Sequence, residues 1–182
     1  MKIFCSTAFV LGAILATGCG KLTSVEPLAN KQNVVFDATL VGQWTDEEGS
    51  IYIVRDTGSQ SYEIDCVNKD GSRDETMALK ASLVQLGDQR VLDLSARNEA
   101  AFSITGHAFV RVVHVGDNLE VRFIGSDWLQ DQIIHSGSPA YFMHEKHPVI
   151  TASSGELQAF LSTFGLSDAA LEEPAILRPL DQ

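Results

Sequence analysis

Residues 107–124 read HAFVRVVHV-GDN-LEVRFI, and this stretch decides the fold class. Its first segment, 107–115, is rich in Val, a residue that packs well on a pleated strand. The turn at 116–118 then leads into a second apolar segment at 119–124. Two β segments joined by so short a turn predict an antiparallel hairpin.

Shorter segments of the same kind precede the hairpin. Turn residues separate them, notably at 68–72 and 87–89. Consecutive strands joined by short turns lie antiparallel to one another. We therefore expect an antiparallel meander that buries one face, either by wrapping into a barrel or half-barrel or by packing against a helix. The expected strands before the hairpin cover residues 43–46, 50–55, 62–67, 76–86 and 91–95.

The last third of the chain contains two helix signals. Ser126 is expected to cap a short helix over 127–135, whose apolar side carries Trp, Leu and Ile. Ser153 and Glu156 have the spacing of a capping box at the start of a second helix. Gly165 is expected to end that helix.

The segments around these helices complete the predicted domain. Residues 139–147 are expected to be irregular and 149–151 to form a brief strand. Residues 175–180 are expected to form a last strand, which Pro179 confines to an edge of the sheet. The sequence thus predicts a single mainly β domain over residues 34–182, with one or two C-terminal helices.

The N-terminus has the three parts of an export signal. Lys2 precedes an uncharged run from Ile3 to Ala16, and small residues then lead to Cys19. Such a run is too short to span a hydrocarbon core of about 30 Å as a stable helix. We therefore expect residues 1–18 to be a signal peptide.

The end of this signal resembles the lipobox of bacterial lipoprotein precursors, with Ala16 where that family usually has Leu. The resemblance implies that Cys19 carries a thioether-linked diacylglycerol and further acyl chains such as palmitate, and two or more chains anchor a protein stably in a membrane. The residue after Cys19 is Gly20 rather than Asp, and in this it resembles lipoproteins that are sorted to the outer membrane of the cell envelope. Residues 19–33 would then be a lipidated tether. The alternative is an ordinary signal peptide cleaved elsewhere, with Cys19 discarded.

Composition narrows the classes of partner. The chain has 13 Lys and Arg against 24 Asp and Glu, a net charge of −11. So acidic a protein is not expected to bind nucleic acid through charge. Cys5 leaves with the signal and Cys19 is acylated, so Cys66 has no partner for a disulfide. Its place in the alternating segment 62–67 predicts a buried, inert thiol.

Gly42-Gln43-Trp44, at the start of the first strand, resembles the G-x-W signature of lipocalins. The resemblance implies a lipocalin-like barrel whose Trp closes the barrel base. Alternation in the following strands predicts an inward row of apolar side chains. The candidate ligand-binding residues are Trp44, Tyr62, Ile64, Met77 and Leu79.

A broader resemblance covers about residues 40–178 and concerns a group of uncharacterised bacterial exported proteins. It implies a single domain and carries no activity that can be transferred. The segments that carry it are LVGQW at 40–44, LDL at 92–94, FVRV at 109–112, SDWL at 126–129 and the stretch 151–161, which begins with TAS.

No segment of the sequence matches the catalytic and metal-binding motifs that we compared with it. His144, Glu145 and His147 form H-E-x-H, which lacks one residue of the zinc-protease pattern H-E-x-x-H. The acidic stretch 68–75 lacks the ligand spacing of a calcium loop. The sequence contains no G-x-S-x-G, G-x-G-x-x-G or P-loop motif. We therefore expect neither an enzyme, nor a metal site, nor a cofactor.

Two functions remain open, with an enzyme as the least favoured third. The first is a membrane-anchored binding protein that holds a small apolar ligand inside the barrel. The second is an envelope module that contacts another protein or the cell wall. A packed interior without a cavity would exclude the first.

The lipid anchor can be tested at Cys19. Cys19→Ser removes the thiol that the resemblance makes the acylation site, so the variant is expected to leave the membrane fraction and to accumulate as unprocessed precursor. Cell fractionation and mass spectrometry of the N-terminal peptide measure both effects. A variant that stays acylated and membrane-bound would refute the anchor.

Overall fold

The computed structural model describes residues 23–97, 105–144 and 147–180. The predicted signal peptide, Cys19 and Gly20 lie outside the described residues. Within the described ranges, no helix is both long enough and apolar enough to cross a membrane.

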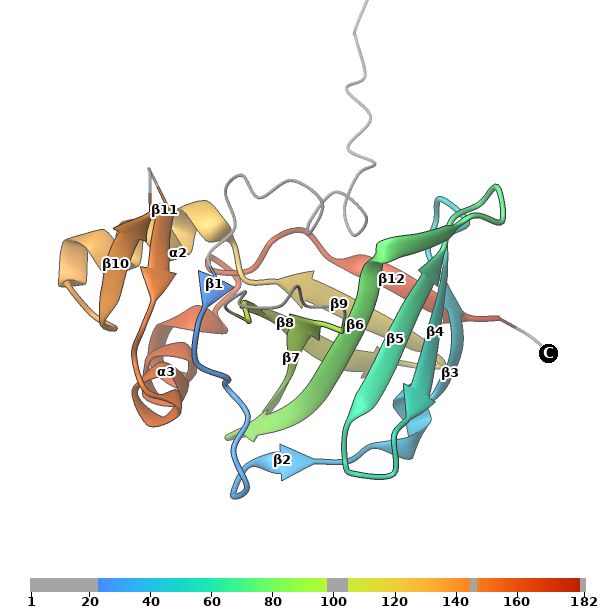
Figure 1. The fold of residues 1–182 in the computed structure, drawn as a ribbon, viewed down its shortest axis with the longest axis horizontal. Helices are drawn as coiled ribbons and strands as arrows, with labels where there is room; N and C mark the ends of the chain where they lie inside the picture. Colours follow the sequence, from blue (N-terminus) through green and yellow to red (C-terminus); the bar gives the residue numbers. More distant parts are fainter. Residues whose placement is uncertain (1–22, 98–104, 145–146, 181–182) are drawn as a thin grey trace, which may run out of the picture.

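Eight strands form a closed antiparallel barrel of lipocalin-like architecture (Figure 1). Seven of them follow one another along the chain as a meander, and the eighth closes the circle by pairing with both the first and the last of these. The predicted fold class is therefore confirmed. The barrel strands are β3 (Gly42–Thr45), β4 (Ile51–Asp56), β5 (Tyr62–Val67), β6 (Arg73–Leu86), β7 (Gln89–Ala96), β8 (His107–Val115), β9 (Asn118–Phe123) and β12 (Ala175–Pro179).

The hairpin predicted at 107–124 is β8 and β9. Their register pairs Val115 with Asn118 and Val112 with Val121. The turn between them is tight because Gly116 has a φ of 62°, in the left-handed region that glycine adopts without strain.

The last strand does not lie at an edge, so that prediction was wrong. β12 pairs with β9 through Ala175 and Val121 and with β3 through Pro179 and Trp44. Pro179 is tolerated there because it is the final residue of the strand. The ladder continues beyond it, since the Leu180 N–H donates to the Gln43 carbonyl.

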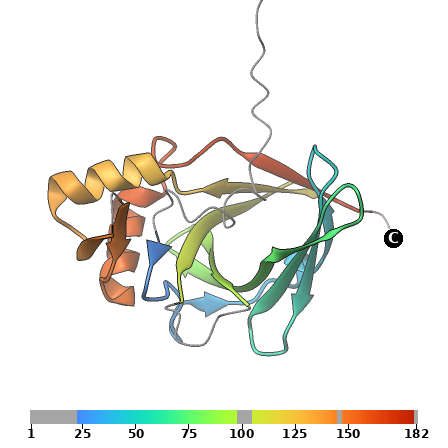
Figure 2. The same ribbon diagram turned by 45° about the horizontal axis from the view of Figure 1, so that its top comes forward.

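A helical layer covers the outside of the barrel over β6, β7 and β8. It contains α2 (Ser126–Ser136), α3 (Ser154–Phe160) and its continuation η2 (Leu161–Gly165), together with a hairpin of β10 (Tyr141–His144) and β11 (His147–Ile150). Figures 1 and 2 show this layer on one side of the barrel. The interior of the barrel forms one hydrophobic core. A second core joins the barrel to the helical layer, with Val84, Val91 and Phe109 from the barrel and Leu129, Ile133 and Leu157 from the helices.

Two details of this layer differ from the sequence predictions. Within the stretch 139–147, predicted as irregular, residues 141–144 form β10 because they pair with β11, which begins at His147. Gly125, not Ser126, is the N-cap residue of α2. The capping box of Ser153 and Glu156 is present at α3.

Residues 23–33, predicted as part of the tether, are instead packed on the domain. Strand β1 (Thr23–Ser24) pairs with β11 and with the start of β8, and β2 (Val34–Val35) pairs with β6. Leu28 is fully buried in the second core. The Asp93 carboxylate of β7 accepts hydrogen bonds from the N–H groups of Leu28 and Ala29, at 2.8 and 3.1 Å. The sequence missed this because the anchoring partner lies far along the chain.

Leu28→Ala tests whether this segment belongs to the folded domain. Removing a fully buried Leu side chain should lower the free energy of unfolding by about 2–5 kcal/mol. Urea denaturation measures the change. Val115→Ala, at a half-exposed position, serves as the control and should have little effect. A loss no larger than that of the control would place residues 23–33 back in a tether.

Candidate functional site

The barrel encloses an apolar cavity of about 70 Å³. Every side chain on its wall is aliphatic or aromatic, and all eight barrel strands contribute to it. Its lining residues are Leu40, Trp44, Tyr52, Val54, Tyr62, Ile64, Leu79, Leu92, Leu94, Ala108, Val110, Val112, Leu119, Val121, Phe123 and Leu177.

Four of the five candidate ligand-binding residues meet at this cavity. Trp44, Tyr62, Ile64 and Leu79 all lie on its wall. Met77 belongs to β6, but its side chain lies outside the described residues. Contact of these residues with a ligand stays a prediction.

The sequence reasoning missed the other half of the wall, which comes from β7, β8, β9 and β12. The signal was available, because alternate residues of a strand share one face. Leu92 and Leu94 in β7, and Val110 and Val112 in β8, follow that alternation.

The G-x-W segment holds a short 3-10 helix, η1 (Ala38–Leu40), against one end of the barrel. The Trp44 indole N–H donates to the Leu40 carbonyl at 3.0 Å. Leu40 itself lines the cavity. This bond satisfies the only polar atom of the Trp side chain and fixes η1 at the barrel end.

The two tyrosine hydroxyls are also bonded at the barrel ends. Tyr62 donates to the Asp37 carbonyl beside η1, whereas Tyr52 donates to the Asp46 carboxylate beyond the far end of β3. Burial raises the pKa of both hydroxyls, and the charge of Asp46 adds to the effect at Tyr52. Both therefore remain protonated donors, and the cavity between them stays apolar.

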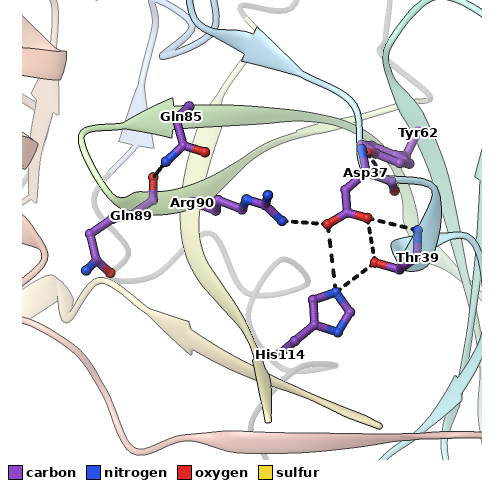
Figure 3. Close-up of polar contacts among 7 residues, drawn as sticks. All are labelled: Asp37, Thr39, Tyr62, Gln85, Gln89, Arg90 and His114. Atoms are coloured by element: carbon purple, nitrogen blue, oxygen red, sulfur yellow. Dashed lines mark hydrogen bonds and ion pairs between the residues drawn. The ribbon is translucent and has the colours of Figure 1, made fainter. Parts of the chain in front are cut away.

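At the η1 end of the barrel lies a polar mouth of about 290 Å³, whose titratable lining residues are Asp37, Asp88, Arg90 and His114. An ion pair of 2.6 Å joins Arg90 Nη1 to Asp37 Oδ2, and His114 Nε2 lies 3.8 Å from the same oxygen. Thr39 Oγ1 lies 2.9 Å from His114 Nε2. Figure 3 shows these side chains converging from separate elements. None of the mouth residues was singled out from the sequence.

The Asp37 carboxylate is held in its charged form. Burial alone would raise its pKa, but hydrogen bonds from Thr39 and the charges of Arg90 and His114 outweigh burial and lower the pKa. The folded mouth therefore favours ionised Asp37. The stability that this group contributes is present above the pKa of Asp37 in the unfolded chain and is lost as the pH falls through its lower folded pKa.

A second polar pocket, of about 380 Å³, lies outside the barrel and includes Asp93 and His107. His107 Nδ1 lies 2.7 Å from Asp93 Oδ1, an arrangement that could orient a general base. Among the described residues, however, no serine hydroxyl is hydrogen-bonded to His107. The other Asp93 oxygen accepts the N–H groups of Leu28 and Ala29. Asp93 therefore holds the N-terminal segment on the domain, and His107 contacts the other oxygen of the same carboxylate.

His144 of the H-E-x-H segment is the last residue of β10, and His147 is the first residue of β11. His144 and His147 pair across the two strands, but Glu145 and the His147 side chain lie outside the described residues. Within the described part of the chain, no three His, Cys, Asp or Glu side chains gather as a metal-binding group.

Comparison with known proteins finds no matching family model, no matching curated protein and no matching solved structure. The class that fold and site define is a small closed β-barrel with an apolar interior and a polar mouth. The resemblances to lipoprotein precursors and to exported proteins stay predictions.

Cys66 provides a chemical probe of the barrel interior. It is buried, as predicted, and burial raises the pKa of its thiol to about 11. Because the thiolate is the reactive form, native Cys66 should react with iodoacetamide at least about a hundredfold more slowly than in the unfolded chain. Peptide mass spectrometry measures this labelling. Equal rates in buffer and in denaturant would show that the barrel interior is open.

Proposed function

We propose that this chain is a lipid-anchored protein of the bacterial cell envelope whose barrel binds a small apolar ligand. The observation that carries the binding function is the cavity with a wholly apolar wall. The export signal and the lipobox ending at Cys19 support the anchor. The proposed activity is binding without catalysis.

The size of the cavity limits the ligand. Typical small-molecule pockets measure about 300–1,000 Å³, whereas this cavity measures about 70 Å³. It suits a short alkyl chain, a single ring or the end of a longer molecule. At about 24 cal/mol per Å³ of void, an empty cavity of this size costs about 2 kcal/mol of stability. An apolar group that fills it would recover part of that cost.

The segment between the proposed lipid anchor and the folded domain is short. Only residues 20–22 separate Cys19 from β1, because the chain is already part of the sheet at Thr23. Four extended residues span at most about 14 Å. A lipid on Cys19 would therefore hold the domain close to the membrane surface.

The observation that favours the second candidate, an interaction module, is the exposed strand β10, outside the barrel. β10 is the terminal strand in the order of the described sheet, and Phe142 and Met143 on it are each 46% exposed. An exposed edge strand with apolar side chains can pair with another protein. This surface is compatible with ligand binding in the barrel.

Ala108→Leu tests the binding function by filling the cavity from within. Ala108 lies on the cavity wall, and the larger side chain adds three carbon atoms to it. Titration of the protein with benzene and with hexane, followed by methyl NMR shifts, should give at least about a tenfold weaker affinity in the variant. Its melting temperature should not fall, because the added carbons occupy empty space.

Ala159→Leu, at an exposed position of α3, is the matched control and should bind like the unmodified protein. Equal binding by both variants would refute the cavity as the site. Native mass spectrometry of the protein purified from its own host then separates the candidates, since a co-purified small molecule supports binding and a co-purified protein supports the interaction module.

A further inference from the structure

Two inward-facing rows of the barrel end in basic side chains at the mouth. The row of β7 passes from Leu94 through Leu92 to Arg90, and the row of β8 passes from Val110 through Val112 to His114. Side chains two residues apart in a strand lie on the same face. Arg90 and His114 therefore stand directly above the apolar wall.

The polar mouth and the apolar cavity adjoin each other. Leu40 and Val112 line both of them. A molecule with its polar group beside Arg90 would thus have its apolar part directed at the cavity. A small cavity is sufficient for such a ligand, because only its apolar chain needs to lie inside the barrel.

Asp37 already places a carboxylate oxygen at the mouth. Its Oδ1 accepts the Thr39 N–H and caps η1, whereas its Oδ2 contacts Arg90 and His114. Asp37 belongs to the segment before the barrel and to no strand. Its Oδ2 can therefore leave Arg90 without breaking a strand pair.

The hairpin that carries Arg90 is held in place from its other side. Across the turn between β6 and β7, the Gln85 side-chain amide donates to the carbonyl oxygen of Gln89 (Figure 3). It also donates to the carbonyl oxygen of Gly87. The guanidinium therefore extends from a fixed turn, and a second anion could replace Asp37 Oδ2 with little movement of the strands. A guanidinium binds carboxylates well because it presents a planar pair of donors.

We infer that the ligand is a single-chain amphiphile with an anionic head such as a carboxylate, and that Asp37 Oδ2 holds the place of this head when the barrel is empty. Arg90 and His114 bind the head, the cavity binds the chain, and Asp37 competes with the head. The inference rests on the proposed binding function and adds the chemical class of the ligand.

Calorimetric titration with octanoate, 1-octanol and octylamine tests the head while the chain stays the same. Octanoate should bind at least about tenfold more tightly than octanol, as one charge-assisted hydrogen bond provides, and octylamine should bind most weakly. Arg90→Gln should abolish the advantage of octanoate without weakening octanol. Asp37→Asn keeps the oxygen that caps η1 and should strengthen octanoate binding severalfold while leaving octanol unchanged.

Arg178→Gln is the matched control for loss of a guanidinium. Arg178 is exposed and pairs with Glu47, away from the mouth residues, so the variant should bind all three compounds like the unmodified protein. Acetate has the head without the chain and should compete only weakly with octanoate.

The outcomes separate this inference from the proposed function. Equal affinities for octanoate and octanol, both lost in Ala108→Leu, would overturn the anionic head and leave apolar binding standing. Octanoate binding that survives Ala108→Leu would mean an anion bound without its chain, which overturns the amphiphile. Binding of none of the three compounds would overturn both proposals.

Discussion

The barrel and its cavity depend on the pairing of one short strand, β12, with both β3 and β9. Without it, those two strands would each present an unpaired edge, and the cavity wall would lose Leu177. β12 follows β9 only after the long excursion over residues 125–174. The entropy cost of closing such a loop grows slowly with its length, and this excursion buries its own apolar side chains in the second core. Closure is therefore compatible with a large insertion between the last two strands.

The cavity is apolar because the polar atoms of its aromatic wall find partners at the two ends of the barrel. Trp44 bonds to Leu40 and Tyr62 to the Asp37 backbone at one end, while Tyr52 bonds to Asp46 at the other. A hydroxyl left unpaired inside would cost about 1–3 kcal/mol. The bonds from Trp44 and Tyr62 also attach η1 to the barrel, so interactions that satisfy polar atoms of the wall position Asp37 above it.

Local patterns in the sequence predicted the strands and helices, and long-range contacts account for most of what it missed. The hairpin of β8 and β9 was predictable because alternation and a tight turn lie within one short stretch. The closing position of β12 was not, since it depends on pairing with Trp44 far along the chain. Leu28 likewise becomes part of the core only through Asp93. The mouth was not predictable from the sequence, because Arg90 and His114 are far from Asp37 along the chain and meet it only in the folded barrel.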